Sequence, residues 1–533
     1  LQSRIVLRGS VLAAAMVAIP VAMVVAAPPA AAADLTTFCD GNLDGNTFTL
    51  TANCATTEPL TVPDGVTVDG AGPGAPPSGY TISASDTGEP QWNGGIVTNE
   101  AAGGSMNIRN LIVTGPPGGF QLCTEANNVL YGIFFNDASG TVDNVTVDNI
   151  FQFQNGAFGS CQTGRAIRAD GLTGARTVTI TSTTVVDYQK SGFEARGSMT
   201  MDLTGSTAGP PRPLEGLISQ NGVSFVNTTT GTVENNTIHG SSDQAPGPGG
   251  FANGTAMLLS NADNLMVNDN TFVGSGTDIG VAVSAGSTGN TISFNAVTRT
   301  ASENPENTDP TGIGINVDPD SSATLICNTF DGWNQNIAGA IQIACTPLPD
   351  GAECELYSAG APTVEGTGTE PFTWSVESGE LPPGLSLAPN GDIAGTPPDN
   401  SEGTYEFTLR VTTANNLTAT SDQEITIAPG CETATPTPTT PTPTTPATET
   451  TPPTPTPTAP TPTQPPSVGP TGGAQPPAVP TGVAAGLPGS DAPISASGAP
   501  DWQLPMMLVG LTLLAAGAVL AAILGRRRGA RRH

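Results

Sequence analysis

The chain has 533 residues, of which 46 are acidic and 16 are basic, so its formal net charge is −30. Such a surface repels polyanions, and this excludes nucleic acid as a partner. The length predicts two or more folded units, and 65 glycines with only 5% aromatic residues favour a turn-rich β structure.

Residues 1–33 have the features of a secretory signal. Arg4 and Arg8 form a basic start, residues 11–25 are mostly apolar, and three alanines at 31–33 offer a cleavage site. The alternative is a retained membrane anchor. Secretion exposes the 8 cysteines to an oxidising environment, where disulfides are favoured over metal ligands. We predict that neighbours in sequence pair, although other connectivities are possible: Cys39 with Cys54, Cys123 with Cys161, Cys327 with Cys345, and Cys354 with Cys431.

Residues 34–345 contain a repeated pair of apolar segments. The first segment of each pair begins with glycine or alanine and recurs roughly every 24 to 37 residues. It starts at Gly95, Gly132, Ala166, Gly192, Gly222, Ala256, Gly280 and Gly312. The second segments cover 108–113, 142–147, 178–185, 233–238, 265–272, 292–297 and 325–330. Their alternating, β-branched residues predict strands.

Asparagine recurs near the end of the second segments. The positions are Asn110, Asn236, Asn270, Asn295 and Asn328. Asparagine tolerates left-handed backbone angles, and its amide can bond an identical neighbour in a ladder. We therefore predict a turn residue that is repeated from coil to coil.

This repeat pattern resembles the right-handed parallel β-helix repeat proteins of bacteria, over about 240 to 300 residues of the chain. The resemblance implies an all-β solenoid, in which stacking of the coils creates the core. It does not imply one function, because that fold hosts lyases, hydrolases, epimerases and non-catalytic adhesins. Long polar stretches at 204–217, 241–253 and 298–311 predict loops that gather on one face.

Residues 355–428 change to short alternating strands with frequent turn signals, which predicts a β-sandwich. The stretches 372–376, 381–387, 391–397 and 403–411 closely resemble the putative-Ig family of bacterial surface proteins. Some relatives bind calcium through an acidic residue after the Tyr-x-Phe strand. The corresponding residues here end in Asn415-Asn416 and include no acid. We predict no cofactor, with Ca²⁺ as the one ion to test.

The last hundred residues predict an anchor. Thr-Pro repeats make residues 433–500 an extended, unpacked stalk. Leu504 to Leu524 is long and apolar enough to cross a bilayer, and the basic residues in 525–533 predict a cytoplasmic tail. Residues 487–491, Leu-Pro-Gly-Ser-Asp, resemble a sortase signal with departures at its last two positions. Covalent attachment to a cell wall therefore stays an alternative to the membrane span.

The candidate catalytic residues lie in the most charged stretch, 165–196: Arg168, Asp170, Lys190, Glu194 and Arg196. Cations beside acids on a β-helix face could bind an acidic sugar and abstract a proton, as in a uronate lyase. A structural interpretation competes with this one. Aligning Ile167 with Phe193 places Arg168 over Glu194 and Asp170 over Arg196, which gives two cross-coil charge pairs.

Other motif fragments are incomplete. Asn307-Thr308-Asp309 looks like the start of a polygalacturonase site, but the double Asp, Gly-His-Gly and Arg-x-Lys that should follow are absent. His239 lies upstream and is expected at a turn edge. Asp318 and Asp320 flank Pro319, which favours a solvated turn. The metal-site prediction is therefore none.

The predicted protein is a bacterial cell-surface β-helix with an Ig-like spacer, and its predicted role is non-catalytic adhesion or binding of extracellular carbohydrate. Its partners would be a polysaccharide or a host or neighbouring cell surface, with the membrane contacted through Leu504–Leu524. A surface polysaccharide lyase or glycoside hydrolase is the alternative, so the question of an enzyme stays open, leaning towards none. A structural surface-layer component is a second alternative.

Overall fold

The structure is a computed structural model that describes residues 33–85, 92–120, 129–154, 157–158, 163–210, 220–240, 254–275, 277–300 and 312–431. The predicted signal up to residue 32, the stalk, the span and the basic tail lie outside these residues, as do Cys123, Cys161 and the stretch 307–309. Within the described residues, no helix is long and apolar enough to cross a bilayer.

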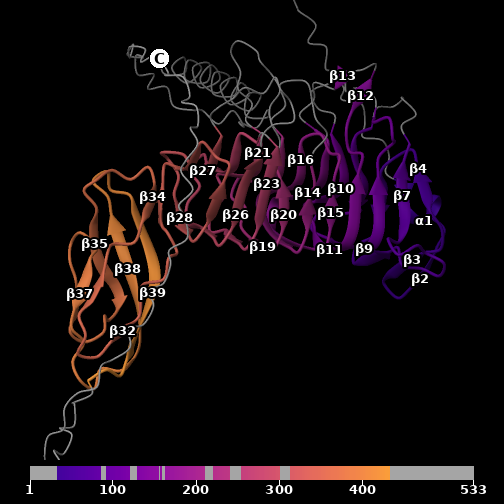
Figure 1. The fold of residues 1–533 in the computed structure, drawn as a ribbon. Helices are drawn as coiled ribbons and strands as arrows, with labels where there is room; N and C mark the ends of the chain where they lie inside the picture. The colour runs from indigo at the N-terminus through magenta and orange to yellow at the C-terminus, as the bar shows by residue number, and fades with distance from the viewer. Residues whose placement is uncertain are drawn as a thin grey trace, which may run out of the picture. The chain divides into compact units, whose positions relative to one another are not determined.

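Most of the described chain winds into a 28-stranded sheet made of three stacks of mainly parallel strands, one strand per coil in each stack (Figure 1). The first stack comprises β1 (Ala33–Asp34), β5 (Leu60–Val62), β8 (Gly94–Asn99), β10 (Leu130–Asn136), the start of β14 (Arg165–Thr181), the start of β16 (Ser191–Thr204), β18 (Asn221–Val226), β21 (Thr255–Ser260), β24 (Ile279–Ser284), β27 (Ile313–Val317) and β30 (Gln335–Ala338).

The second and third stacks complete each coil. The second comprises β3 (Thr47–Leu50), β6 (Val66–Asp69), β9 (Ser105–Thr114), β11 (Ser139–Asp148), the ends of β14 and β16, β19 (Thr232–Glu234), β22 (Met266–Asn268), β25 (Asn290–Ser293) and β28 (Ala323–Ile326). The third comprises β4 (Cys54–Thr56), β7 (Tyr80–Ala84), the ends of β9 and β11, β15 (Thr184–Val185), β17 (Thr207–Ala208), β20 (Thr237–His239), β23 (Thr271–Ser275), β26 (Ala296–Thr300) and β29 (Thr329–Asp331).

The core follows from strand periodicity. Successive side chains of a strand point to opposite faces, so one parity of each strand enters the interior. Ile167 pairs with Phe193, which pairs with Val223, and all three are fully buried. The same column continues through further coils with Met257, Val281 and Ile315. This confirms the predicted stacking of apolar segments.

The N-terminal coils carry smaller elements. Helix α1 (Leu35–Phe38) buries Leu35, and β2 (Gly41–Asp44) forms an antiparallel hairpin with β3. The predicted Cys39–Cys54 disulfide is present. The predicted pair of strands around a Pro-Asp-Gly turn is confirmed as β5 and β6, with Gly65 at φ 75°. A short ribbon, β12 (Phe153–Gln154) and β13 (Ala157–Phe158), stands apart from the stacks.

A buried asparagine ladder forms at the turn between the second and third stacks. The Nδ2 of Asn236 donates to the Oδ1 of Asn270, that of Asn270 to Asn295, and that of Asn295 to Asn328, at 2.9, 3.0 and 2.9 Å. The ladder was predicted, but its backbone geometry was not. The left-handed residue is the one before each ladder asparagine. Asn110 is itself left-handed, at φ 54°, so its predicted place in the ladder is wrong by one residue.

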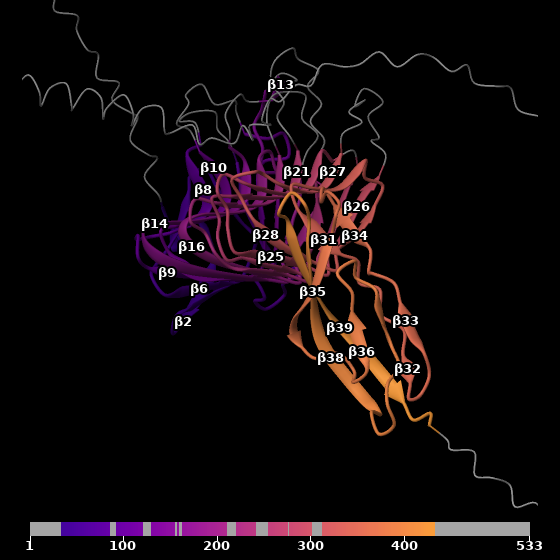
Figure 2. The same cartoon turned by 90° about the vertical axis from the view of Figure 1, so that its left-hand side faces the viewer.

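The Ig-like domain has two main sheets, drawn in orange in Figures 1 and 2. One contains β32 (Gly351–Ala352), β39 (Thr418–Ala428), β38 (Gly403–Thr412) and β35 (Thr373–Gly379), and the other β33 (Tyr357–Ala359), β37 (Ile393–Gly395) and β36 (Leu385–Leu387). A further pair joins β31 (Ile341–Ile343) to β34 (Val364–Gly366). Ile341 and Ile343 belong to this domain's core, together with Trp374 and Phe407.

Two of the predicted loop stretches begin with regular structure. Residues 298–300 are still part of β26, and residues 204–208 contain the end of β16 and all of β17. The predicted Cys327–Cys345 disulfide is present. Cys354 and Cys431 are both disulfide-bonded.

Candidate functional site

The candidate residues meet on the outer face of the first stack. Ile167 and Phe193 point into the core, so the alternation of the strand turns Arg168 and Glu194 outward. The register pairs Arg168 with Glu194 and Asp170 with Arg196, as the sequence predicted. We call Arg165, Arg168, Asp170, Ser191 and Glu194 the charged cluster.

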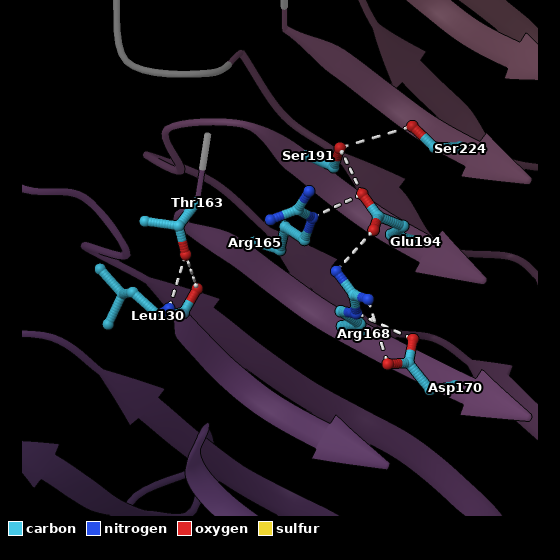
Figure 3. Close-up of polar contacts among 8 residues, drawn as sticks. All are labelled: Leu130, Thr163, Arg165, Arg168, Asp170, Ser191, Glu194 and Ser224. Carbon is cyan, nitrogen blue, oxygen red and sulfur yellow. Dashed lines mark hydrogen bonds and ion pairs between the residues drawn. The ribbon is translucent and has the colours of Figure 1, made fainter. Parts of the chain in front are cut away.

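The charged cluster is a closed set of ion pairs (Figure 3). Arg168 grips Asp170 of its own strand with two hydrogen bonds, from Nε at 2.8 Å and from Nη2 at 3.0 Å. Its Nη1 donates to Oε1 of Glu194, 3.0 Å away on the next coil. Arg165 donates from Nε to the other Glu194 oxygen at 2.6 Å. Both carboxylates are therefore held by guanidinium groups.

A hydroxyl pair and an aromatic ring border the charged cluster. Ser191 donates to Oε2 of Glu194 at 3.3 Å and lies 3.4 Å from the hydroxyl of Ser224 on the following coil. The ring of Tyr131, one coil earlier, has its centroid 5.1 Å from Cζ of Arg168. A cation over an aromatic face is stabilised by the ring quadrupole.

Burial makes these pairs unusual for an outer face. Arg168, Asp170 and Glu194 are 6%, 4% and 5% exposed. Burial by itself raises the pKa of Glu194, but the nearby positive charges of Arg165 and Arg168 outweigh it and hold the pKa at about 2. Burial lowers the pKa of Arg168, and Tyr131 and the two carboxylates more than reverse this, so that the net pKa is raised.

The arrangement limits what the cluster can do chemically. A general base works best when its pKa lies near the working pH, and a carboxylate with a pKa of about 2 binds protons too weakly for that role. Burial and the neighbouring Arg168 lower the pKa of Arg196, whose side chain is partly exposed. The charged cluster therefore has the properties of a structural ion-pair network.

The remaining candidates lie elsewhere or have backbone roles. Lys190 comes just before β16, where its N–H donates to the carbonyl of Gly164 at 2.8 Å. His239 ends β20, half-buried, and burial lowers its pKa. Asp318 accepts a 2.9 Å hydrogen bond from Asn316, and burial raises its pKa, while Asp320 is exposed. These residues do not join the charged cluster in the described part of the chain.

Sequence reasoning missed Tyr131 and Ser191. Both occupy the same column as Arg165, since β10 pairs Tyr131 with Arg165 and β16 pairs Arg165 with Ser191. The signal was available in the repeat alignment, because all three precede the small residue that starts each first segment.

The described residues include one group with metal-ligand geometry: Glu353, Asp399 and Cys431. Glu353 accepts hydrogen bonds from the backbone N–H groups of Ser401 and Glu402 at 2.5 and 2.8 Å. Cys431 is disulfide-bonded and offers no thiolate. The group therefore fits a loop clamp better than a metal site. At the loop where relatives of the Ig-like domain bind calcium, the Oδ1 of Asn415 accepts from the N–H of Thr369 at 3.0 Å.

Two families match the chain. The family described as "Right handed beta helix region" matches residues 131–346. The family described as "Putative Ig domain" matches residues 352–428. The chain carries a right-handed parallel β-helix followed by an Ig-like domain. These matches agree with the strand stacks and the two sheets described above.

Several solved structures are also similar to the chain. A double mutant of a periplasmic alginate epimerase is 13% identical, with 58% of this chain and 71% of that one covered and a TM-score of 0.36. The enzymatically active domain of tailspike protein 2 from bacteriophage CBA120 is 11% identical, with 72% and 66% covered and a TM-score of 0.36. Full-length tailspike protein 2 from an Escherichia coli O157:H7 bacteriophage is 10% identical, with 72% and 59% covered and a TM-score of 0.34. No curated protein matches the chain.

Proposed function

We propose that this protein binds extracellular carbohydrate without cleaving it. The observation that carries the proposal is the state of the charged cluster. Its acids and bases neutralise one another in a buried network, and the carboxylate of Glu194 is held ionised with a pKa of about 2. An enzyme that removes a proton from a sugar needs a base with a free, accessible electron pair.

The outer surface of the β-helix supports the binding half of the proposal. Parallel coils place like residues in rows, which display hydroxyl and amide groups at the strand spacing of about 4.8 Å. Examples are Asn110 with Asn144 and Asn107 with Thr141, each joined at 2.9 Å. Carbohydrates are recognised through hydroxyl groups, and such rows offer many hydrogen-bonding partners to a long polymer.

The proposed location is the cell surface. It is supported by the signal-like residues 1–33, the Thr/Pro-rich stretch 433–500 and the apolar residues Leu504–Leu524. Disulfides at Cys39–Cys54 and Cys327–Cys345 fit an oxidising compartment. The β-helix would be displayed outside the cell, where polysaccharides and neighbouring cell surfaces are reachable.

A binding and turnover screen tests the proposal. The purified chain is titrated against soluble neutral and acidic polysaccharides, with and without calcium, and bound polymer is measured together with new reducing ends and unsaturated products. We expect at least one polymer to bind while its chain length stays unchanged. A matched Glu194→Gln variant should give the same absence of products. Failure to bind any polymer would contradict the proposal.

The second candidate is a polysaccharide lyase or glycoside hydrolase. The observation that favours it is the convergence of Arg165, Arg168 and Arg196 with two carboxylates on one outer face, since cations of this kind can hold an acidic sugar. It predicts product release in the same screen, and loss of that release in Glu194→Gln. Ordered arrays without glycan binding would instead support a structural surface-layer role.

A further inference from the structure

One column of turn residues runs along the β-helix between the second and third stacks. In eight successive coils, the residue at this turn has a left-handed backbone, with φ between 48° and 58°. We call it the turn column, and it consists of Asn110, Asn144, Ser182, Gly205, Asn235, Asp269, Phe294 and Cys327. The backbone N–H of each coil's turn residue reaches the next coil, as in Asp269 to Ser293 at 3.2 Å and Phe294 to Ile326 at 2.9 Å.

Phe294 is the exception in the turn column. Glycine, asparagine and aspartate are the residues that enter the left-handed region most readily, whereas a bulky side chain there is strained. Most members of the column are small and polar, and Cys327 is fixed by its disulfide to Cys345. Phe294 also leaves 56% of its surface exposed, so core packing does not explain the choice of residue. Strain kept at an exposed site points to a functional role.

The surroundings of Phe294 are polar and acidic. On the preceding coil, Asp269 is exposed and accepts a hydrogen bond from the amide of Asn268 at 2.5 Å. That amide oxygen in turn accepts from the hydroxyl of Ser293 at 2.9 Å. One coil further away, the same edge carries Glu234, which pairs with Asn268. An exposed ring is thus bordered by amide, hydroxyl and carboxylate groups, with two acids close to it in the coil order.

We propose that Phe294 is the stacking platform for a sugar ring of a neutral polysaccharide. This inference rests on the proposed carbohydrate-binding function and locates its site. The apolar C–H face of a sugar ring packs on an aromatic face, whose negative quadrupole attracts the polarised hydrogens. Hydroxyl groups at the edge of the sugar can then bond to Asp269 and to the Asn268–Ser293 pair. Asp269 and Glu234 repel uronic acids, which sets the preference for a neutral ring.

Substitutions at Phe294 separate this role from a structural one. Phe294→Asn places a residue that tolerates left-handed angles into the turn, so we expect the midpoint of thermal unfolding to be unchanged or higher. The affinity for a neutral glucan or chitin-derived oligosaccharide should fall at least tenfold. Phe294→Trp should keep the affinity within threefold of the unaltered chain. Leu43→Asn, which changes a 61% exposed apolar residue on the β2–β3 hairpin, serves as the matched control.

The outcomes separate the two proposals. If the unaltered chain binds neutral glycans and Phe294→Asn binds them equally well, the Phe294 site is wrong while carbohydrate binding stands. If Phe294→Asn lowers the unfolding midpoint and the affinity together, and Phe294→Trp does not restore binding, the ring is a packing residue and the site is again wrong. If the unaltered chain binds only uronate polymers, the neutral preference is wrong. If it binds no glycan, the proposed function itself fails.

Discussion

Arg168 and Glu194 occupy paired positions on consecutive coils, with Nη1 of the arginine 3.0 Å from Oε1 of the glutamate. Both side chains are 7% exposed, so their charges interact with little solvent between them. The same guanidinium holds Asp170 through a second edge. Arg168 is thus the common partner of two buried carboxylates, and its removal leaves them with fewer compensating charges.

Arg168→Leu should therefore be strongly destabilising. Breaking a buried ion pair by removing one partner costs about 3–5 kcal/mol, because the remaining charge stays buried. Arg410→Leu is the matched control, since Arg410 pairs with Glu377 at 3.1 Å on the surface of the Ig-like domain. Surface pairs contribute about 0–1 kcal/mol. Chemical denaturation followed by circular dichroism measures both, and equal losses for the two variants would show that the cluster is not buried.

The reversed pair tests the coil register. Arg168→Glu should destabilise the β-helix by placing a carboxylate against Glu194 and Asp170. Adding Glu194→Arg restores attraction across the coils, but the new arginine faces Arg165. We expect recovery of part of the lost free energy of unfolding. A double variant no more stable than Arg168→Glu would mean that residues 168 and 194 are not paired.

The stability of the β-helix should depend on pH through Glu194. Burial raises the pKa of this carboxyl, but Arg165 and Arg168 hold the net value at about 2, below its ordinary value of 4.5. A depressed folded-state pKa contributes stability that is complete above the ordinary pKa and is lost as the pH falls from about 4.5 towards 2. The contribution at neutral pH is about 3 kcal/mol.

Glu194→Gln removes this titration. Its unfolding free energy should therefore change less between pH 6 and pH 3 (about two units either side of the ordinary carboxyl pKa) than that of the unaltered chain. Glu424→Gln changes an exposed glutamate of β39 and is the matched control. Denaturation midpoints at several pH values provide the measurement. Parallel pH profiles for the unaltered chain and Glu194→Gln would contradict the assigned shift.

Asn270→Leu should disrupt the asparagine ladder from its middle. Asn270 donates from Nδ2 to the carbonyl of Val233 at 2.7 Å, and its Oδ1 accepts from the backbone N–H of Asn236 at 3.0 Å. Leucine leaves both buried backbone groups without these partners, at about 1–3 kcal/mol for each group. Thr271→Ala, at the exposed neighbouring position, should change stability by about 0.5 kcal/mol or less. Equal effects of the two variants would rule out a stabilising ladder.

The sequence was sufficient to predict the coil register. Because side chains alternate with a period of two, aligning Ile167 with Phe193 in the core determines that Arg168 faces Glu194. The repeated asparagines likewise predicted a ladder. Their backbone angles were harder, because either residue of the turn can adopt the left-handed conformation, and the structure assigns it to Asn235 and Asp269 and not to Asn236 and Asn270.

The burial of the charged cluster was not predictable from one coil's pattern. Arg168 was expected to pair across the coils, and it also bonds Asp170 two residues along its own strand. That contact depends on side-chain rotamers, which periodicity does not encode. Ile341 and Ile343 were assigned to the β-helix by their position in the chain, yet their tertiary contacts lie in the core of the Ig-like domain. Local patterns alone do not show which of two adjacent cores an apolar strand joins.

The most direct test of the account is the length of a bound polysaccharide before and after prolonged incubation with a stoichiometric amount of the purified chain. Size-exclusion chromatography with light scattering follows the polymer, and a parallel assay counts reducing ends and unsaturated products. The account predicts that the polymer binds and is recovered at its original length. Shortened or unsaturated polymer, with activity lost in Glu194→Gln, would contradict it and make the charged cluster a catalytic site.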